Sequence, residues 1–238
     1  MIKISRKNLF KLIIKGSLFI ISFFLVLLYP VEIIKFFSIS ILFFKIYHLV
    51  WLIIIIGLLK SLLTIPKNIS AGKIYLKYFK ENKILTPEKL KIELNLLKKE
   101  YNKKVFVSAL VTLLVITSFL LFYSILNLNE LWIYVFVIFA IFFDSFCVAI
   151  WCPFRNYIIK NKCCNSCRIY NWGYLMMFLP LNLIPSFWTY SIIFLSILIL
   201  IQWEYIHYKH PERFYEISNS NLMCKNCKYS TGFCKNKK

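Results

Sequence analysis

The chain has 238 residues, of which 60% are hydrophobic and 18% aromatic, and it carries a net charge of +20. A soluble domain is only about 45–50% apolar, so the composition favours a membrane protein and argues against a soluble nucleic-acid-binding domain. In membrane proteins, an excess of Lys and Arg collects on the cytoplasmic side and faces anionic lipid. The expected partners are therefore the lipid bilayer, with anionic lipid at the basic face, and not nucleic acid.

Apolar runs long enough to cross a bilayer recur along the chain, without the alternating pattern of a membrane barrel. Because lipid offers no hydrogen bonds to the backbone, such runs fold as helices. The sequence predicts an all-α, polytopic integral membrane helix bundle with about five spans, interfacial amphipathic helices and a Cys-rich cytoplasmic face. The expected location is the cell membrane, multi-pass, with the N-terminus in the cytoplasm.

Two spans are predicted in residues 1–65. A basic start precedes an apolar run that ends at Pro30, which predicts an uncleaved span over about residues 9–29. Charged residues interrupt the first half of the stretch that follows. We therefore expect an interfacial helix over about residues 31–47 and a second span over about residues 48–65.

Residues 66–104 form a basic amphipathic segment that we expect on the cytoplasmic side. Thr86 followed by Pro87 is a helix start signal, and the apolar residues after it recur on one helical face. This segment is expected to lie on the inner membrane surface, to pack under the spans, or to dock a partner membrane protein.

The remaining membrane helices are expected within residues 105–206. Spans over 105–126 and 131–151 are joined by a short turn without Lys or Arg, which belongs outside the cell. The apolar stretch 174–205 is longer than one span and shorter than two, and two prolines break its first half. A single kinked span would leave the tail outside. A shallow first half followed by a second crossing would return it to the cytoplasm, and we favour this second arrangement.

Most of the eight cysteines belong to two groups, one in the Cys-rich loop 152–172 and one in the Cys-rich basic tail 207–238. Cysteines two residues apart recur in zinc and iron–sulfur sites, because a tight turn aims both sulfurs at one ion. The main candidate metal ligands are Cys164, Cys167, Cys224 and Cys227. The reserve or second-site candidates are Cys152, Cys163, Cys234 and His210. Cys147, inside the fourth span, is expected to pack in the core.

Four interpretations of these cysteines stay open. They form one composite site for zinc or an iron–sulfur cluster, with a structural or electron-relay role, or they are the two thiol groups of a membrane thiol–disulfide oxidoreductase. Alternatively, they form structural disulfides in an external tail, or they bind nothing. The spacing does not distinguish zinc from iron, and no sequence motif decides whether the chain is an enzyme.

Asp144 lies within the fourth span, where a carboxyl group is costly and is therefore a functional candidate. A transporter or structural membrane subunit that uses Asp144 is a further alternative, and a hydrogen bond to a neighbouring helix is the simpler explanation. Near the end of the last span, Trp203, Tyr205 and Tyr208 predict an aromatic belt at the membrane interface.

Overall fold

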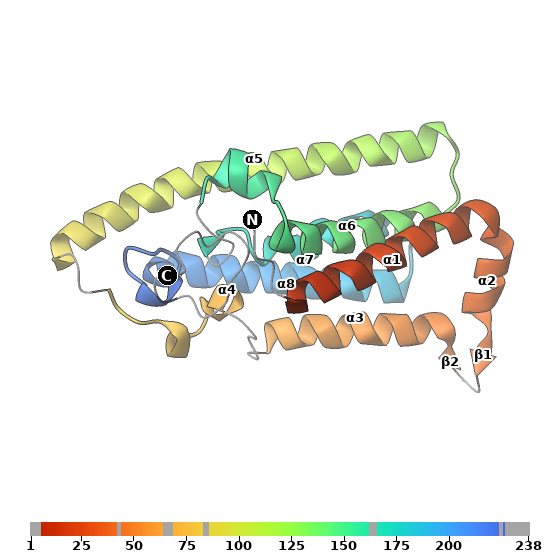
Figure 1. Ribbon diagram of the computed structural model, residues 1–238, viewed down its shortest axis with the longest axis horizontal. Coiled ribbons are helices and arrows are strands. Elements are labelled where there is room, and N and C mark those ends of the chain that lie inside the picture. Colours follow the sequence, from red (N-terminus) through yellow and green to blue (C-terminus); the bar gives the residue numbers. More distant parts are fainter. Residues whose placement is uncertain are drawn as a thin grey trace.

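The computed structural model describes residues 6–41, 44–63, 69–82, 86–161, 166–223 and 226. This part of the chain is predominantly helical (Figure 1). The longer helices are α1 (Arg6–Leu28), α2 (Pro30–Ser38), α3 (Ile46–Leu62), α5 (Pro87–Ile125), α6 (Leu131–Ala149), α7 (Trp172–Phe178) and α8 (Phe187–Lys209). The shorter elements are strands β1 (Ser40–Ile41) and β2 (Phe44–Lys45), helix α4 (Ile69–Gly72), a π-helical turn at Phe154–Ile159, and 3₁₀ turns at Leu76–Tyr78, Leu179–Leu183, Pro211–Arg213 and Ser220–Leu222.

Four of the described helices, α1, α5, α6 and α8, are long and apolar enough to cross a membrane. Helix α3 is also apolar but has only 17 residues. Large apolar side chains point outward from these helices: Ile53 is 71% exposed, Leu114 65% and Phe194 61%. Soluble monomers rarely expose apolar surface on this scale, so the helices indicate a membrane environment.

The turn between the first two apolar helices differs from the prediction. Helix α2 ends at Ser38 and is shorter than the interfacial helix expected over residues 31–47. It is followed by the two-residue strands β1 and β2, in which Ser40 pairs with Lys45 in antiparallel register. Helix α3 then begins at Ile46.

The helices form an elongated bundle in which neighbours pack in pairs (Figure 1). Helix α1 runs antiparallel to α6, and the rings of Phe23 and Trp132 lie 5.4 Å apart. Helix α3 runs parallel to α8, and the rings of Trp51 and Trp188 lie 4.8 Å apart. The buried aliphatic and aromatic residues between α3, α6, α7 and α8 are Ile55, Leu58, Ile133, Val137, Phe178, Leu181, Ile184, Ile192, Ile193 and Ile199.

Helix α5 is about 58 Å long, at 1.5 Å per residue for 39 residues. It begins at Pro87, as the sequence predicts, although the side chain of Thr86 at the N-cap position makes no capping hydrogen bond. The amphipathic helix and the span that we expected as separate elements are one continuous helix. Its first half extends beyond the bundle (Figure 1), where the rings of Tyr101 and Tyr215 lie 5.5 Å apart. The basic part of α5 therefore packs against the chain that follows α8.

The stretch after α6 does not form a single kinked helix. Helix α7 and the 3₁₀ turn at Leu179–Leu183 run back along the bundle, and Ser186 caps α8 by accepting from the Thr189 N–H. Helix α8 then returns to the end at which α7 begins (Figure 1). As a result, the described chain after α8 lies at the same end of the bundle as residues 166–172.

We call this end of the molecule the basic end. It consists of the start of α1, the end of α3, the start of α5 and residues 69–82, 150–172 and 203–223. Apart from Lys35 and Lys45, every Lys and Arg in the described part of the chain lies at or toward it.

Candidate functional site

A buried ion pair joins the loop after α6 to the last turns of α8. The Arg168 guanidinium donates to both carboxylate oxygens of Glu204, at 2.7 and 2.5 Å. The Trp172 indole N–H donates to the same carboxylate at 2.7 Å. The Arg168 side chain is 2% exposed and that of Glu204 is 37% exposed, so the pair lies at the edge of the interior. Such bidentate contacts restrict the relative position of both side chains.

The network continues into His207, one turn after Glu204. An Arg168 guanidinium nitrogen lies 3.0 Å from Nδ1 of His207, and Nε2 lies 2.9 Å from the Tyr215 hydroxyl oxygen. Because a guanidinium only donates, Nδ1 accepts, and the ring proton is on Nε2 and is donated to Tyr215. Burial raises the pKa of Tyr215 above its ordinary value. The Tyr215 hydroxyl therefore stays protonated over the physiological range.

Lys73 brings the segment that contains α4 into the same site. Its side chain is buried, its ammonium donates to the Cys167 carbonyl at 2.9 Å, and it lies 5.7 Å from the centre of the Trp203 ring. The Trp203 indole N–H donates to the Arg168 carbonyl at 2.8 Å. Trp203 is fully buried. Trp203 does not face outward, because the chain after α8 folds back over it and Phe214 packs against its ring. The aromatic belt at the membrane interface stays a prediction.

Backbone contacts hold the chain after α8 to the segment that contains α4. The Asn82 N–H donates to the Ser218 carbonyl at 2.9 Å. Next to this contact, Glu81 and Asn219 form an isolated antiparallel bridge. The described chain therefore reaches Met223 at the basic end, at the same end of the bundle as Arg168 and Trp172.

The structure describes only part of the predicted cysteine site. Outside the described residues lie Cys163, Cys164, Cys224, Cys227 and Cys234. Within them, Cys147, Cys152 and Cys167 are thiols, and no group of three or more His, Cys, Asp and Glu side chains is arranged to hold a metal ion. His210 lies 3.1 Å from the Glu212 carboxylate. The ligand roles of the cysteines and of His210 stay predictions.

The thiols of Cys147 and Cys152 contact each other. The Cys152 sulfur accepts hydrogen bonds from the Cys147 thiol and, at 3.4 Å, from the Arg155 N–H. These hydrogen bonds, the one from Cys147 foremost, lower the pKa of Cys152 to about 7 in spite of its partial burial. This effect of Cys147 on Cys152 could not be predicted from the spacing of the two residues.

Cys167 has a different environment, deep beside the ion pair. Burial raises the pKa of its thiol to about 11, although the nearby cations of Lys73 and Arg168 act in the opposite direction. Its neighbours in the adjoining cluster are Ile159 and Ile169. A neutral thiol is the stable form at this position unless a further positive charge is bound next to it.

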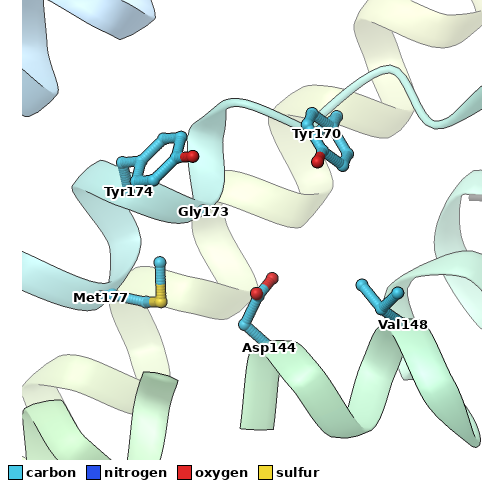
Figure 2. Close-up of a pocket in the computed structure, with 6 residues that line it drawn as sticks. All are labelled: Asp144, Val148, Tyr170, Gly173, Tyr174 and Met177. Atoms are coloured by element: carbon cyan, nitrogen blue, oxygen red, sulfur yellow. The ribbon is translucent and has the colours of Figure 1, made fainter. Parts of the chain in front are cut away.

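Asp144 points into a small hollow between α6 and α7 (Figure 2). The hollow has a volume of about 70 Å³, enough for a few water molecules. Lys15 of α1 is close enough for its charge to attract the carboxylate. Apart from Asp144, the hollow is lined by Val148, Tyr170, Gly173, Tyr174 and Met177. The acid predicted within the fourth span therefore lies at a small hollow and within electrostatic reach of Lys15.

Reasoning from the sequence did not identify Arg168, Glu204 and His207 as one site. A signal was present, because a carboxylate and an imidazole in the last turns of an apolar helix require polar partners. The partner could not be chosen from the sequence, since Arg168 lies 36 residues before Glu204.

Comparison of the chain with protein-family models, with curated proteins and with solved structures found no match in any of the three. Bundles of apolar helices serve many unrelated functions, so the fold alone implies none. The function has to be argued from the site itself.

Proposed function

We propose that this chain is a multi-pass protein of the cell membrane with its basic end, and its N-terminus, in the cytoplasm. The distribution of charge supports this orientation, because only Lys35 and Lys45 of the described basic residues lie toward the opposite end. An excess of Lys and Arg is typical of the cytoplasmic side. In this proposal α3 crosses the membrane as a fifth long helix, and α7 with the 3₁₀ turn at Leu179–Leu183 takes the chain back across before α8 returns it to the cytoplasm. Anionic lipid headgroups contact the basic end.

We further propose that the basic end carries a metal site, either zinc or an iron–sulfur cluster. Its four ligands are the sulfurs of Cys164, Cys167, Cys224 and Cys227. One observation carries this proposal: the described residues next to the two cysteine groups, on both sides of the loop group and before the tail group, converge at the same end of the bundle. Arg168 binds Glu204 and His207 near the end of α8, and the tail is held there as far as Met223.

The reach of the chain supports a shared site. Cys164 is two residues before Ser166, and Cys224 directly follows Met223. Because a residue extends the chain by at most about 3.6 Å, these short separations in sequence are compatible with a site shared by the two groups. Cysteine ligands from two distant segments would then close over one ion, as in structural zinc sites.

The environment of Cys167 also suits a ligand. Lys73 and Arg168 favour a thiolate there, whereas burial disfavours it and keeps the pKa of the free thiol at about 11. A bound metal ion supplies the additional positive charge and replaces the thiol proton. Zinc would clamp the loop to the tail, and an iron–sulfur cluster would relay electrons at the membrane surface.

The proposal is tested by elemental analysis of the full chain, purified in detergent under reducing conditions. We expect about one zinc ion or one iron–sulfur cluster per chain, and iron–sulfur absorbance only in the second case. The variants Cys167→Ser and Cys227→Ser should lose most of the metal, whereas the control Cys147→Ser should keep it. Wild-type protein without zinc or iron, or an equal loss in the control, would contradict the proposal.

A second candidate function is a transporter or structural subunit that uses Asp144. The hollow next to Asp144 supports it, since it has room for water beside a carboxyl group within a span, and such groups often mark polar paths. A hydrophobic carbodiimide applied to native membranes should then modify Asp144, and the modification should be absent in Asp144→Asn. An unmodified Asp144 in the wild-type protein argues against the path.

A further inference from the structure

Asp144 is exposed at the hollow between α6 and α7, and no residue that the structure describes donates a hydrogen bond to its carboxyl group. Lys15 attracts the carboxylate from a distance, but its ammonium donates to the Ile141 carbonyl at 3.5 Å. Lys15 is also not among the described residues that line the hollow. A carboxyl group within a span is costly without a polar partner, so the hollow has the charge of a site for a cation.

Three side chains that carry oxygen point into this hollow (Figure 2). The carboxyl group of Asp144 enters it from α6. The hydroxyl groups of Tyr170, in the turn before α7, and of Tyr174, within α7, point toward the same space. The apolar side chains of Val148 and Met177 complete the lining. The hollow therefore combines one charged and two neutral oxygen groups with apolar sides.

The position and the size of the hollow restrict what it can hold. Asp144 lies five residues before Ala149, the last residue of α6, which is about 8 Å along the helix axis. The hollow is therefore close to the basic end. Its volume of about 70 Å³ has room for only a few groups of the size of water. A small cation, or the charged end of a longer molecule, fits these limits.

We propose that the hollow binds a primary ammonium group, R–NH₃⁺, of a small soluble amine or of an ethanolamine lipid headgroup. Such a group has three N–H donors and no acceptor, and three oxygen groups face it. Hydrogen bonds from a cation to a carboxylate are among the strongest in proteins. The proposal rests on the second candidate function, in which Asp144 lies on a polar path, and it names the class of cation that binds there.

Binding of radiolabelled methylammonium to the full chain, purified in detergent, tests the proposal. We expect saturable binding at a single site, without competition from tetramethylammonium, which has the same charge but no N–H. Asp144→Asn should abolish binding. Tyr174→Phe, which removes one acceptor, should weaken binding by at least about tenfold. The control is Glu130→Gln, which removes an exposed acid just before the other end of α6 and should bind like the wild-type protein.

The variant Gly173→Ala separates binding from folding. Its added methyl group would lie 3.8 Å from a carboxyl oxygen of Asp144, an ordinary van der Waals distance, so the variant should fold like the wild-type protein. The methyl group takes up part of the hollow, and methylammonium binding should become several times weaker. Unchanged binding in Asp144→Asn or in Gly173→Ala overturns the proposal, as does equal competition by tetramethylammonium or potassium.

Two further measurements identify the source of the ammonium group and separate this proposal from the function on which it rests. If the lipid headgroup occupies the hollow, methylammonium binds more weakly in nanodiscs of phosphatidylethanolamine than in those of phosphatidylcholine. If the ligand is a soluble amine, binding is equal in both. Asp144 that is labelled by carbodiimide but binds no methylammonium overturns the ammonium site alone. Asp144 that is not labelled argues against the polar path as well.

Discussion

Replacing Glu204 by Gln tests the ion pair at the basic end. The change leaves the Arg168 guanidinium, whose side chain is 2% exposed, without its counter-charge and removes one of the two carboxylate oxygens that accept from it. Removal of one partner from a fully buried pair costs about 3–5 kcal/mol. Because 37% of the Glu204 side chain is exposed, water replaces part of the lost contact, and we expect a loss of about 2–3 kcal/mol.

For a chain of this length the loss corresponds to a decrease in Tm of about 4–12 °C. Thermal unfolding in detergent, followed by tryptophan fluorescence, measures it, since Trp172 and Trp203 lie in the site. The matched control is Glu212→Gln, which removes an equally exposed carboxylate from an exposed partner, His210. The reasoning is refuted if the two variants have the same Tm, or if Glu204→Gln is as stable as the wild-type protein.

Three further predictions follow from described contacts and from the proposed orientation. Alkylation of Cys152 requires the thiolate, so its rate should rise with pH around a midpoint of about 7, and Cys147→Ala should move this midpoint upward. A methyl group on Gly72 would lie 2.7 Å from the Tyr78 ring, and Gly72→Ala should therefore destabilise the protein by about 1–3 kcal/mol in thermal unfolding. A membrane-impermeant thiol reagent applied to intact cells should leave Cys224 and Cys227 unlabelled, and labelling would place the tail outside.

Local signals predicted the positions of the apolar helices. The predicted spans over residues 9–29 and 131–151 correspond closely to α1 and α6, because hydropathy depends on composition within one segment. The start of α5 at Pro87 was predicted for a similar reason. Thr followed by Pro favours a helix start through the conformation of the nearby backbone, so no distant contact is needed. The predicted break before residue 105 is absent. The change from charged to apolar residues there moves the helix from an aqueous to an apolar environment, but it does not interrupt the backbone hydrogen bonds of the helix.

Contacts between distant segments could not be predicted in this way. Nothing in the sequence indicates that Arg168 pairs with Glu204, or that the tail folds back and buries Trp203. The aromatic-belt rule treats the end of a span as an isolated segment in lipid, whereas Trp203 is covered by the chain that follows it. The contact of Cys147 with Cys152 depends on the bend after Ala149, whose direction the spacing alone does not define.

The ion pair between Arg168 and Glu204 is better explained by positional specificity than by stability. Desolvation offsets most of the attraction within a buried pair, so the loss expected for Glu204→Gln measures an unpaired charge and not the net contribution of the pair. The two parallel hydrogen bonds between Arg168 and Glu204 hold the two chain segments in one relative position, whereas an apolar contact allows several. One segment carries Cys167, and the other leads through the tail to Cys224. The metal site that we propose would need its ligands within about 0.2 Å of ideal distances. A directional polar contact next to Cys167 suits such a site better than an apolar contact, which would leave the loop more freedom to shift.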